Sequence, residues 1–344
     1  MSVEAGRACD WSAASSSEQC AAAGATDSLT FQVKPVPPFR LDLTVQALRR
    51  RAINAIDRWN CTTYRRILVV DGRPLGIEVV QIAPSERPRL QVTARGSSLP
   101  PSARLAVISA LSRLLGFDRR LDDFYAAAAD DPGLDQFARR FRGLKPPRFP
   151  TVFEALINAF ACQQVTLSLG IQLLNRLAAA CEPGLDVQGD RAHAFPSPDA
   201  LARLEPDEFR ALGFSRQKGA AMVELARAVA GGRLDLDELE ELDDAAAVAW
   251  LRSLRGVGRW TAEYVLLRGL GRLHVFPGDD VGARNGLQHW LGILEPLDYD
   301  VRRVLARWQP FQGLVYLHLL LWGLHSEHGK PTAKVRRLGN RMLR

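Results

Sequence analysis

The stretch that decides the fold is Leu251-Arg-Ser-Leu-Arg-Gly-Val-Gly-Arg-Trp-Thr-Ala-Glu-Tyr264, followed from Val275 by Val-Phe-Pro-Gly-Asp-Asp280. It predicts the end of one helix, a tight glycine hairpin and the start of a second helix. Gly256 and Gly258 flank one apolar residue, and glycine permits the positive φ and close backbone approach that such a turn requires. A Pro/Gly loop then delivers a carboxylate at Asp280.

The hairpin suits contact with a phosphate backbone. Arginines flank it on both sides, and the helix that starts there has free N–H groups that favour an anion. Contacts of this kind hold DNA without reading its sequence. The predicted DNA-binding hairpin consists of Arg255, Gly256, Val257, Gly258, Arg259 and Thr261.

The motif L-x-G-V-G-x-W-T-A-E-Y, followed by V-F-P-x-x-D, resembles the helix-hairpin-helix/Gly-Pro-Asp superfamily of DNA glycosylases. Within that superfamily it is most similar to the alkylation-repair branch, DNA-3-methyladenine glycosylase II. The resemblance extends to Phe153–Val165, Phe195–Leu201 and Arg307–Phe311, and it covers about residues 117–324 in order and spacing. A weaker likeness, beginning at Pro37-Pro-Phe-Arg40, reaches the N-terminal half.

Asp280 is the catalytic residue that the resemblance implies. Cleavage of an N-glycosidic bond places positive charge on the sugar, and a fixed carboxylate stabilises that charge and orients or deprotonates water. The start of a helix, after Pro277-Gly278, favours the ionised form. The alternative for Asp280 is a plain helix N-cap. Asp279 is the rival carboxylate, and we expect it to support the base pocket.

Trp260 distinguishes two mechanisms. Relatives that also cut the DNA backbone carry a Schiff-base lysine at this position, so a tryptophan here implies a monofunctional enzyme that uses water. Its ring can also attract a cationic alkylated base through a cation–π interaction, which contributes about 1–2 kcal/mol to binding. The alternative is a core aromatic residue. Tyr264, one turn later, is expected to form a second wall of the pocket, together with Leu320 and Trp322. Glu263 is expected to be solvated.

Gln164 occupies the position of the apolar wedge that fills the duplex after base flipping in the resembling enzymes. Here it is polar, and it is either that wedge or a helix cap. The family also implies a monovalent cation bound by hairpin backbone carbonyls. Side chains predict no metal site, because the five cysteines are scattered and none follows Cys181, which excludes a C-terminal iron–sulfur cluster.

Four parts are predicted along the chain, beginning with a disordered Ala- and Ser-rich tail, residues 1–32. Residues 33–116 form an α+β domain with an antiparallel sheet, in which 41–45 is a strand, 46–59 is a helix, and 64–70, 75–82 and 89–94 are strands. Residues 117–325 form an all-α helix-hairpin-helix glycosylase domain with a cleft between its halves. Residues 326–344 are a basic tail that either touches phosphate or is simply solvated.

The formal net charge of +7 and the pI of about 9.5 suit a polyanionic partner without proving one. No apolar run approaches a membrane span, and no secretory signal begins the chain. We expect a cytoplasmic, nucleoid-associated monomer of bacterial type.

The predicted function is base excision repair. The enzyme would flip 3-methyladenine or 7-methylguanine out of double-stranded DNA and hydrolyse its N-glycosidic bond, leaving an abasic site. Two alternatives remain open at this point. One is a glycosylase for an oxidised or deaminated base, and the other is a non-catalytic helix-hairpin-helix protein that binds DNA.

Overall fold

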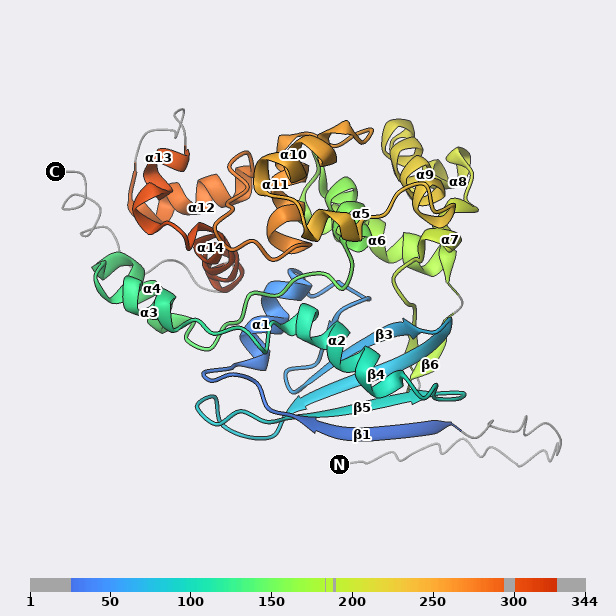
Figure 1. Cartoon of the computed structure of the whole chain (residues 1–344), viewed down its shortest axis with the longest axis horizontal. Helices are drawn as coiled ribbons and strands as arrows, with labels where there is room; N and C mark the ends of the chain where they lie inside the picture. The colour runs from blue at the N-terminus through green and yellow to red at the C-terminus, as the bar shows by residue number, and fades with distance from the viewer. Residues whose placement is uncertain (1–25, 183, 188–189, 294–300, 327–344) are drawn as a thin grey trace, which may run out of the picture.

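The computed structural model describes residues 26–182, 184–187, 190–293 and 301–326 (Figure 1). A five-stranded antiparallel sheet forms the N-terminal part, in the order β1-β5-β4-β3-β2. Its strands are β1 (Asp27–Val33), β2 (Arg58–Trp59), β3 (Thr63–Val70), β4 (Arg73–Gln81) and β5 (Leu90–Gly96). Asp71 and Gly72 join β3 to β4 as a two-residue turn in which both residues have positive φ, as the Asp-Gly pair predicts. The expected antiparallel α+β region is therefore confirmed.

The prediction of a disordered tail over residues 1–32 is wrong for its last residues. Asp27 to Gln32 belong to β1, which pairs with β5 along its whole length and places Phe31 opposite Val92. The backbone ladder and the burial of Phe31 hold this segment, although its composition is polar. The earlier tail residues lie outside the described part of the chain.

The strand expected at residues 41–45 and the helix expected at 46–59 are also corrected. The structure has one helix, α1 (Leu41–Arg49). Leu41, Val45 and Leu48 pack on the sheet, whereas Leu43 and Ala47 pack with the C-terminal helices. Because this helix packs against two cores on two of its sides, its apolar residues alternate with polar ones as in a strand. A helix with a single buried face would show apolar residues at helical spacing instead.

The remainder is helical, as expected. Its elements are α2 (Ala103–Leu115), α3 (Asp122–Ala129), α4 (Pro132–Arg140), α5 (Val152–Cys162), α6 (Leu167–Cys181), α7 (Pro198–Ala202), α8 (Pro206–Leu212), α9 (Arg216–Ala230), α10 (Asp244–Ser253), α11 (Arg259–Arg268), α12 (Val281–Leu291), α13 (Val301–Leu305) and α14 (Gln312–Ser326). Helix α2 packs on the sheet and belongs to its core. A short hairpin of β6 (Leu185–Val187) and β7 (Asp190–Ala192), which the sequence did not predict, packs against β4.

The helices form two apolar cores. One is built around α5, with α6, α9, α10 and α11. The other joins α3 and α4 to α12 and α14. Every residue of α5 from Val152 to Ala161 is buried, so α5 is enclosed on all sides. The loop between α11 and α12 runs from the first core to the second, and it carries Asp280. No helix within the described ranges has the length and hydropathy to cross a membrane. The basic tail lies outside those ranges after Ser326.

His318 is a buried titratable group in the second core. It is 1% exposed, its Nδ1 lies 2.7 Å from the Leu314 carbonyl, and its ring is 5.2 Å from that of Phe124. Burial lowers the pKa of His318 from 6.5 to about 4. The folded state therefore keeps this imidazole neutral over a range in which the unfolded chain takes up a proton.

We expect His318 to make the fold sensitive to acid. Its contribution is complete above pH 6.5 and is lost as the pH falls towards 4, a difference of roughly 3 kcal/mol in the free energy of unfolding. Urea unfolding of the wild type and of His318→Gln between pH 4 and 7.5 measures this. The variant should show a shallower loss of stability at acid pH, and equal slopes for the two proteins would contradict the assignment.

Candidate active site

The glycine hairpin joins α10 to α11. Gly256 has a φ of +80°, and a Cβ there would lie 3.1 Å from the Ala221 Cβ and 3.3 Å from the Phe160 ring. Gly258 is the N-cap of α11, and a Cβ there would meet no atom within 4 Å. Among the residues that the structure describes, no side chain caps this helix start. The hairpin therefore packs tightly at Gly256 and leaves an open N-terminus at Gly258, where an anion can approach the free N–H groups.

Gln163 ties the hairpin to the turn between α5 and α6. Its Nε2 donates to the Gly256 carbonyl at 2.9 Å and to Thr261 Oγ1 at 2.8 Å. Thr261 is only 1% exposed. Its hydroxyl therefore holds the hairpin from inside, and Thr261 is not on the surface where the sequence analysis placed it among the DNA-binding residues. Val257 is buried as well, whereas Arg255 and Arg259 are exposed.

Gln164 lies at the surface next to this tether. It is exposed and has a φ of +53°. The C-cap of α5 is Gln163 and the N-cap of α6 is Thr166, so Gln164 caps neither helix. The helix-cap alternative is therefore wrong. Its role as a wedge stays a prediction, which its exposure on a turn anchored to the hairpin supports.

Asp280 is both an N-cap and a carboxylate with further donors. Asp280 is the residue directly before α12, and its Oδ1 accepts the Ala283 N–H at 2.8 Å. Its Oδ2 accepts the Tyr316 hydroxyl at 2.9 Å and, more weakly, Trp260 Nε1 at 3.4 Å. The half-buried carboxylate is therefore oriented by three donors from three helices, and no cation pairs with it in the described part of the chain.

Tyr316 is a partner of Asp280 that the sequence did not predict. It lies on α14, is 8% exposed, and has a pKa that burial raises well above 10. Its hydroxyl therefore remains protonated and donates to Asp280. The available signal was weak, because Tyr316 precedes the predicted pocket residue Leu320 by one helical turn and so shares its face.

Trp260 and Tyr264 stack against each other on α11, with ring centroids 5.3 Å apart and planes 27° from parallel. Trp260 is half-buried and Tyr264 is buried. The Tyr264 hydroxyl accepts a hydrogen bond from Arg50 Nη1 at 3.0 Å, and burial raises the pKa of Tyr264. The structure thus brings Trp260 into contact with both Tyr264 and the Asp280 carboxylate.

Glu263 is buried, so the expectation that it is solvated is wrong. Its Oε2 accepts the Gly278 N–H at 3.0 Å, and its Oε1 pairs with Arg259 at 3.1 Å and with Arg302. It therefore fixes the Pro/Gly loop two residues before Asp280. Asp279 is exposed and lies 3.9 Å from Arg259, at the outer side of the same loop.

The last two predicted pocket residues lie on α14 and are half-buried. Leu320 is one turn from Tyr316 and so faces the same side. Trp322 packs on His289, with ring centroids 5.1 Å apart. His289 is in the last turn of α12 and Asp280 precedes its first. The structure therefore does not bring Trp322 to the carboxylate.

The cation that the family implies at the hairpin would need backbone carbonyls. Those of Leu254 and Gly256 already accept one hydrogen bond each, from Val257 N–H and from Gln163. Each carbonyl has a second lone pair, so the residues fit such an ion, which stays a prediction. Among the described residues, no cluster of three His, Cys, Asp or Glu side chains could hold a metal.

The chain is similar to known DNA repair proteins. The profile of the HhH-GPD superfamily of base excision DNA repair proteins matches residues 157–310. The DNA-3-methyladenine glycosylase of Bacillus subtilis is 30% identical over 224 residues, which cover 64% of this chain and 72% of that protein. This chain belongs to the HhH-GPD superfamily of DNA glycosylases. The matched residues include the hairpin around Gly256 and the loop that carries Asp280.

Further relatives agree with this assignment. DNA-3-methyladenine glycosylase 2 of Escherichia coli is 27% identical over 82% of this chain and 94% of its own. The solved structure of the Archaeoglobus fulgidus 3-methyladenine DNA-glycosylase shares the fold, with a TM-score of 0.75 and 24% identity over 88% of this chain and all of that one. The Schizosaccharomyces pombe glycosylase Mag1, solved with abasic DNA, has a TM-score of 0.50 and 24% identity over 61% of this chain and 99% of its own.

We expect Tyr316→Phe to slow base excision by this glycosylase about tenfold, because Asp280 loses one of the donors that orient it. Single-turnover excision at saturating enzyme measures the effect. Tyr125→Phe is the matched control, since the Tyr125 hydroxyl accepts the Gly143 N–H and has no other hydrogen bond within the described ranges. Equal excision rates for the two variants would contradict a contribution of Tyr316 to the orientation of Asp280.

Glu263→Gln should slow excision by roughly tenfold as well, since a neutral amide holds Gly278 and its two arginine partners less firmly than a carboxylate does. Glu241→Gln changes an exposed residue and serves as the control. The measurement is the single-turnover rate, with the melting temperature recorded for both variants. A wild-type rate in Glu263→Gln means that Glu263 does not position the loop.

Proposed function

We propose that this glycosylase flips an alkylated purine, such as 3-methyladenine or 7-methylguanine, out of double-stranded DNA and hydrolyses its N-glycosidic bond, leaving an abasic site. One observation carries the proposal. The Asp280 carboxylate is aligned by three donors and has no cationic partner among the described residues. Such a carboxylate is suited to stabilise the positive charge that develops on the sugar and to activate water.

The aromatic pair supports an electron-deficient base as substrate. Trp260 is half-buried and so keeps part of its ring accessible, beside the carboxylate that would face the sugar. An indole face attracts a cationic purine by roughly 1–2 kcal/mol. A cationic base also leaves without protonation, so a second, acidic group is not required.

Hydrolysis without strand cleavage is the second part of the proposal. A Schiff-base mechanism needs a lysine at the sugar. The described lysines are engaged or placed elsewhere. Lys145 donates to the Arg119 carbonyl at 2.6 Å and Lys218 to the Gln163 carbonyl at 2.6 Å, while Lys34 is exposed directly after β1. This arrangement favours a monofunctional enzyme.

DNA binding would use the hairpin. The open N-terminus of α11 and the exposed Arg255 and Arg259 suit a phosphate group, and Gln164 would enter the gap left by the flipped base. Mag1, which shares this fold, was solved with abasic DNA, the product expected here. We also propose that the protein acts as a monomer.

The central experiment incubates the protein with methylated genomic DNA and identifies the bases released into solution. We expect 3-methyladenine and 7-methylguanine, and abasic sites without nicks. Asp280→Asn should lower excision at least a hundredfold, while its dissociation constant for lesion DNA stays within about threefold, because hairpin contacts dominate binding.

Asp243→Asn is the matched control, since Asp243 caps α10 through Ala246 as Asp280 caps α12 through Ala283. This variant shows how much the loss of an N-cap carboxylate alone lowers excision. Release of oxidised or deaminated bases alone would support a different lesion range. Full activity in Asp280→Asn would end the catalytic assignment.

A further inference from the structure

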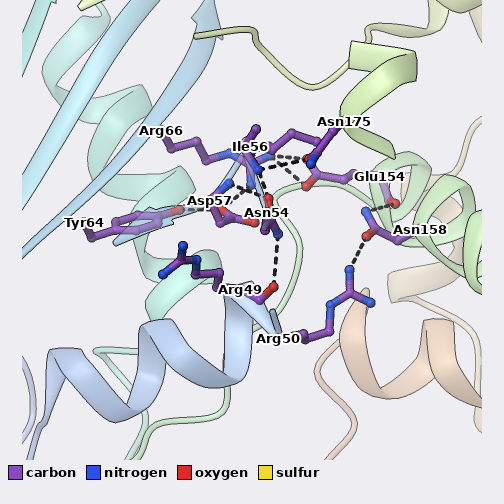
Figure 2. Close-up of polar contacts among 11 residues, drawn as sticks. Arg49, Arg50, Asn54, Ile56, Asp57, Tyr64, Arg66, Glu154, Asn158 and Asn175 are labelled. Atoms are coloured by element: carbon purple, nitrogen blue, oxygen red, sulfur yellow. Dashed lines mark hydrogen bonds and ion pairs between the residues drawn. The ribbon is translucent and has the colours of Figure 1, made fainter. Parts of the chain in front are cut away.

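Arg50 reaches the base-pocket wall from outside the helical region. It ends α1 in the left-handed backbone region, with a φ of +64°, and is only 5% exposed. Figure 2 shows its guanidinium directed towards Asn158 of α5. A non-glycine residue with positive φ is uncommon. Here this conformation turns the chain out of α1 while the side chain reaches residues of α5 and α11.

The guanidinium is shared between two polar partners. One nitrogen donates to Asn158 Oδ1 at 2.6 Å, and the other donates to the Tyr264 hydroxyl at 3.0 Å and lies 3.8 Å from Cys162 Sγ. Its Cζ lies 5.6 Å from the Phe149 ring centroid. Two rigidly spaced donors therefore fix the Tyr264 ring relative to α5, which a single-point ammonium cannot do.

This contact continues to the catalytic carboxylate. Tyr264 stacks on Trp260, and Trp260 Nε1 is 3.4 Å from Asp280 Oδ2. Arg50 touches neither Trp260 nor Asp280 in these contacts, so it would act through Tyr264. It is a positioning residue contributed by α1, the helix that is shared between the sheet and the C-terminal core.

Asp57 attracts the charge of Arg50 only from beyond ion-pair distance. No carboxylate pairs with Arg50 among the described residues, although Arg66 in the same region pairs with both Asp57 and Glu154 (Figure 2). Arg268 is also buried, and its Cζ lies 5.3 Å from the same Phe149 ring. A guanidinium stays charged when buried. Tyr264 therefore has fixed positive charge behind it.

We propose that Arg50 positions Tyr264 and sets the specificity of the pocket, because its fixed charge lowers the preference for cationic bases over neutral ones. Trp260 attracts a cationic base, and the guanidinium behind Tyr264 repels it through a medium of low dielectric constant. Removal of the charge would shift the balance towards cationic bases. This inference rests on the proposed base pocket.

Two substitutions separate position from charge. Arg50→Met keeps the length of the side chain and removes both the charge and the donors, whereas Arg50→Lys keeps the charge and loses the paired donors. The control is Lys145→Met, which removes another buried cation, bonded to the Arg119 carbonyl. Melting temperatures identify any loss of folded protein.

The positioning of Tyr264 by Arg50 is tested by the single-turnover rate of 7-methylguanine excision. Both Arg50 variants should be slower by about tenfold, and Lys145→Met by less than twofold. The effect of the charge is measured in variants that also carry Asp280→Asn. The quantity is the ratio of the affinity for a duplex containing 7-methylguanine to the affinity for a duplex containing hypoxanthine. Arg50→Met should raise this ratio roughly fivefold, while Arg50→Lys and Lys145→Met leave it unchanged.

Wild-type rates and ratios in both Arg50 variants would overturn the inference. So would changes that only match the loss of folded protein. If Arg50→Met does not fold, Arg50→Lys decides the positioning role and Arg268→Met, with the same affinity ratio, decides the role of charge. Failure of the proposed function has a different signature, since the wild type itself would then release no alkylated base.

Discussion

The orientation of the Asp280 carboxylate is the constraint on which the rest of the site depends. Three donors from three helices converge on it: the Ala283 N–H of α12, the Trp260 indole of α11 and the Tyr316 hydroxyl of α14. Each donor is held by packing of its own helix, and α11 packs mostly in the first core whereas α14 packs in the second. The carboxylate is therefore aligned only when both cores are packed against each other, so the architecture and the chemistry are coupled.

Charged side chains connect separate segments of this molecule. Glu263 connects the hairpin side of α11 to the loop that carries Asp280 through Gly278 N–H, Arg259 and Arg302. Arg66, Asp57 and Glu154 form a buried cluster between the sheet and α5. Burial makes each of these groups costly unless it is paired, so the surrounding segments have little freedom to shift. Rigidity of this kind suits the role that we propose for Asp280 beside a sugar.

The sequence predicted more of the local structure than of the relations between segments. The Asp71-Gly72 turn and the hairpin around Gly256 follow from local backbone requirements, and both were identified. The errors concern residues with partners far along the chain. Leu41 to Val45 looked like a strand because they face two cores, and Glu263 looked solvated because two of its three partners, Gly278 and Arg302, are distant in sequence. Tyr316 offered only a weak local signal, its place one helical turn before Leu320, because what distinguishes it is its contact with Asp280.

The sequence by itself determined the family, the helical hairpin and the residue that delivers the carboxylate, because these depend on glycine conformations and short spacings that any chain with this motif must satisfy. Only the tertiary structure decided what surrounds that carboxylate. It placed Tyr316 at Asp280 and Arg50 at Tyr264, buried Thr261 and Glu263, and left Trp322 at the far end of α12. These outcomes depend on how helices from separate parts of the chain pack, which local patterns of residues do not specify.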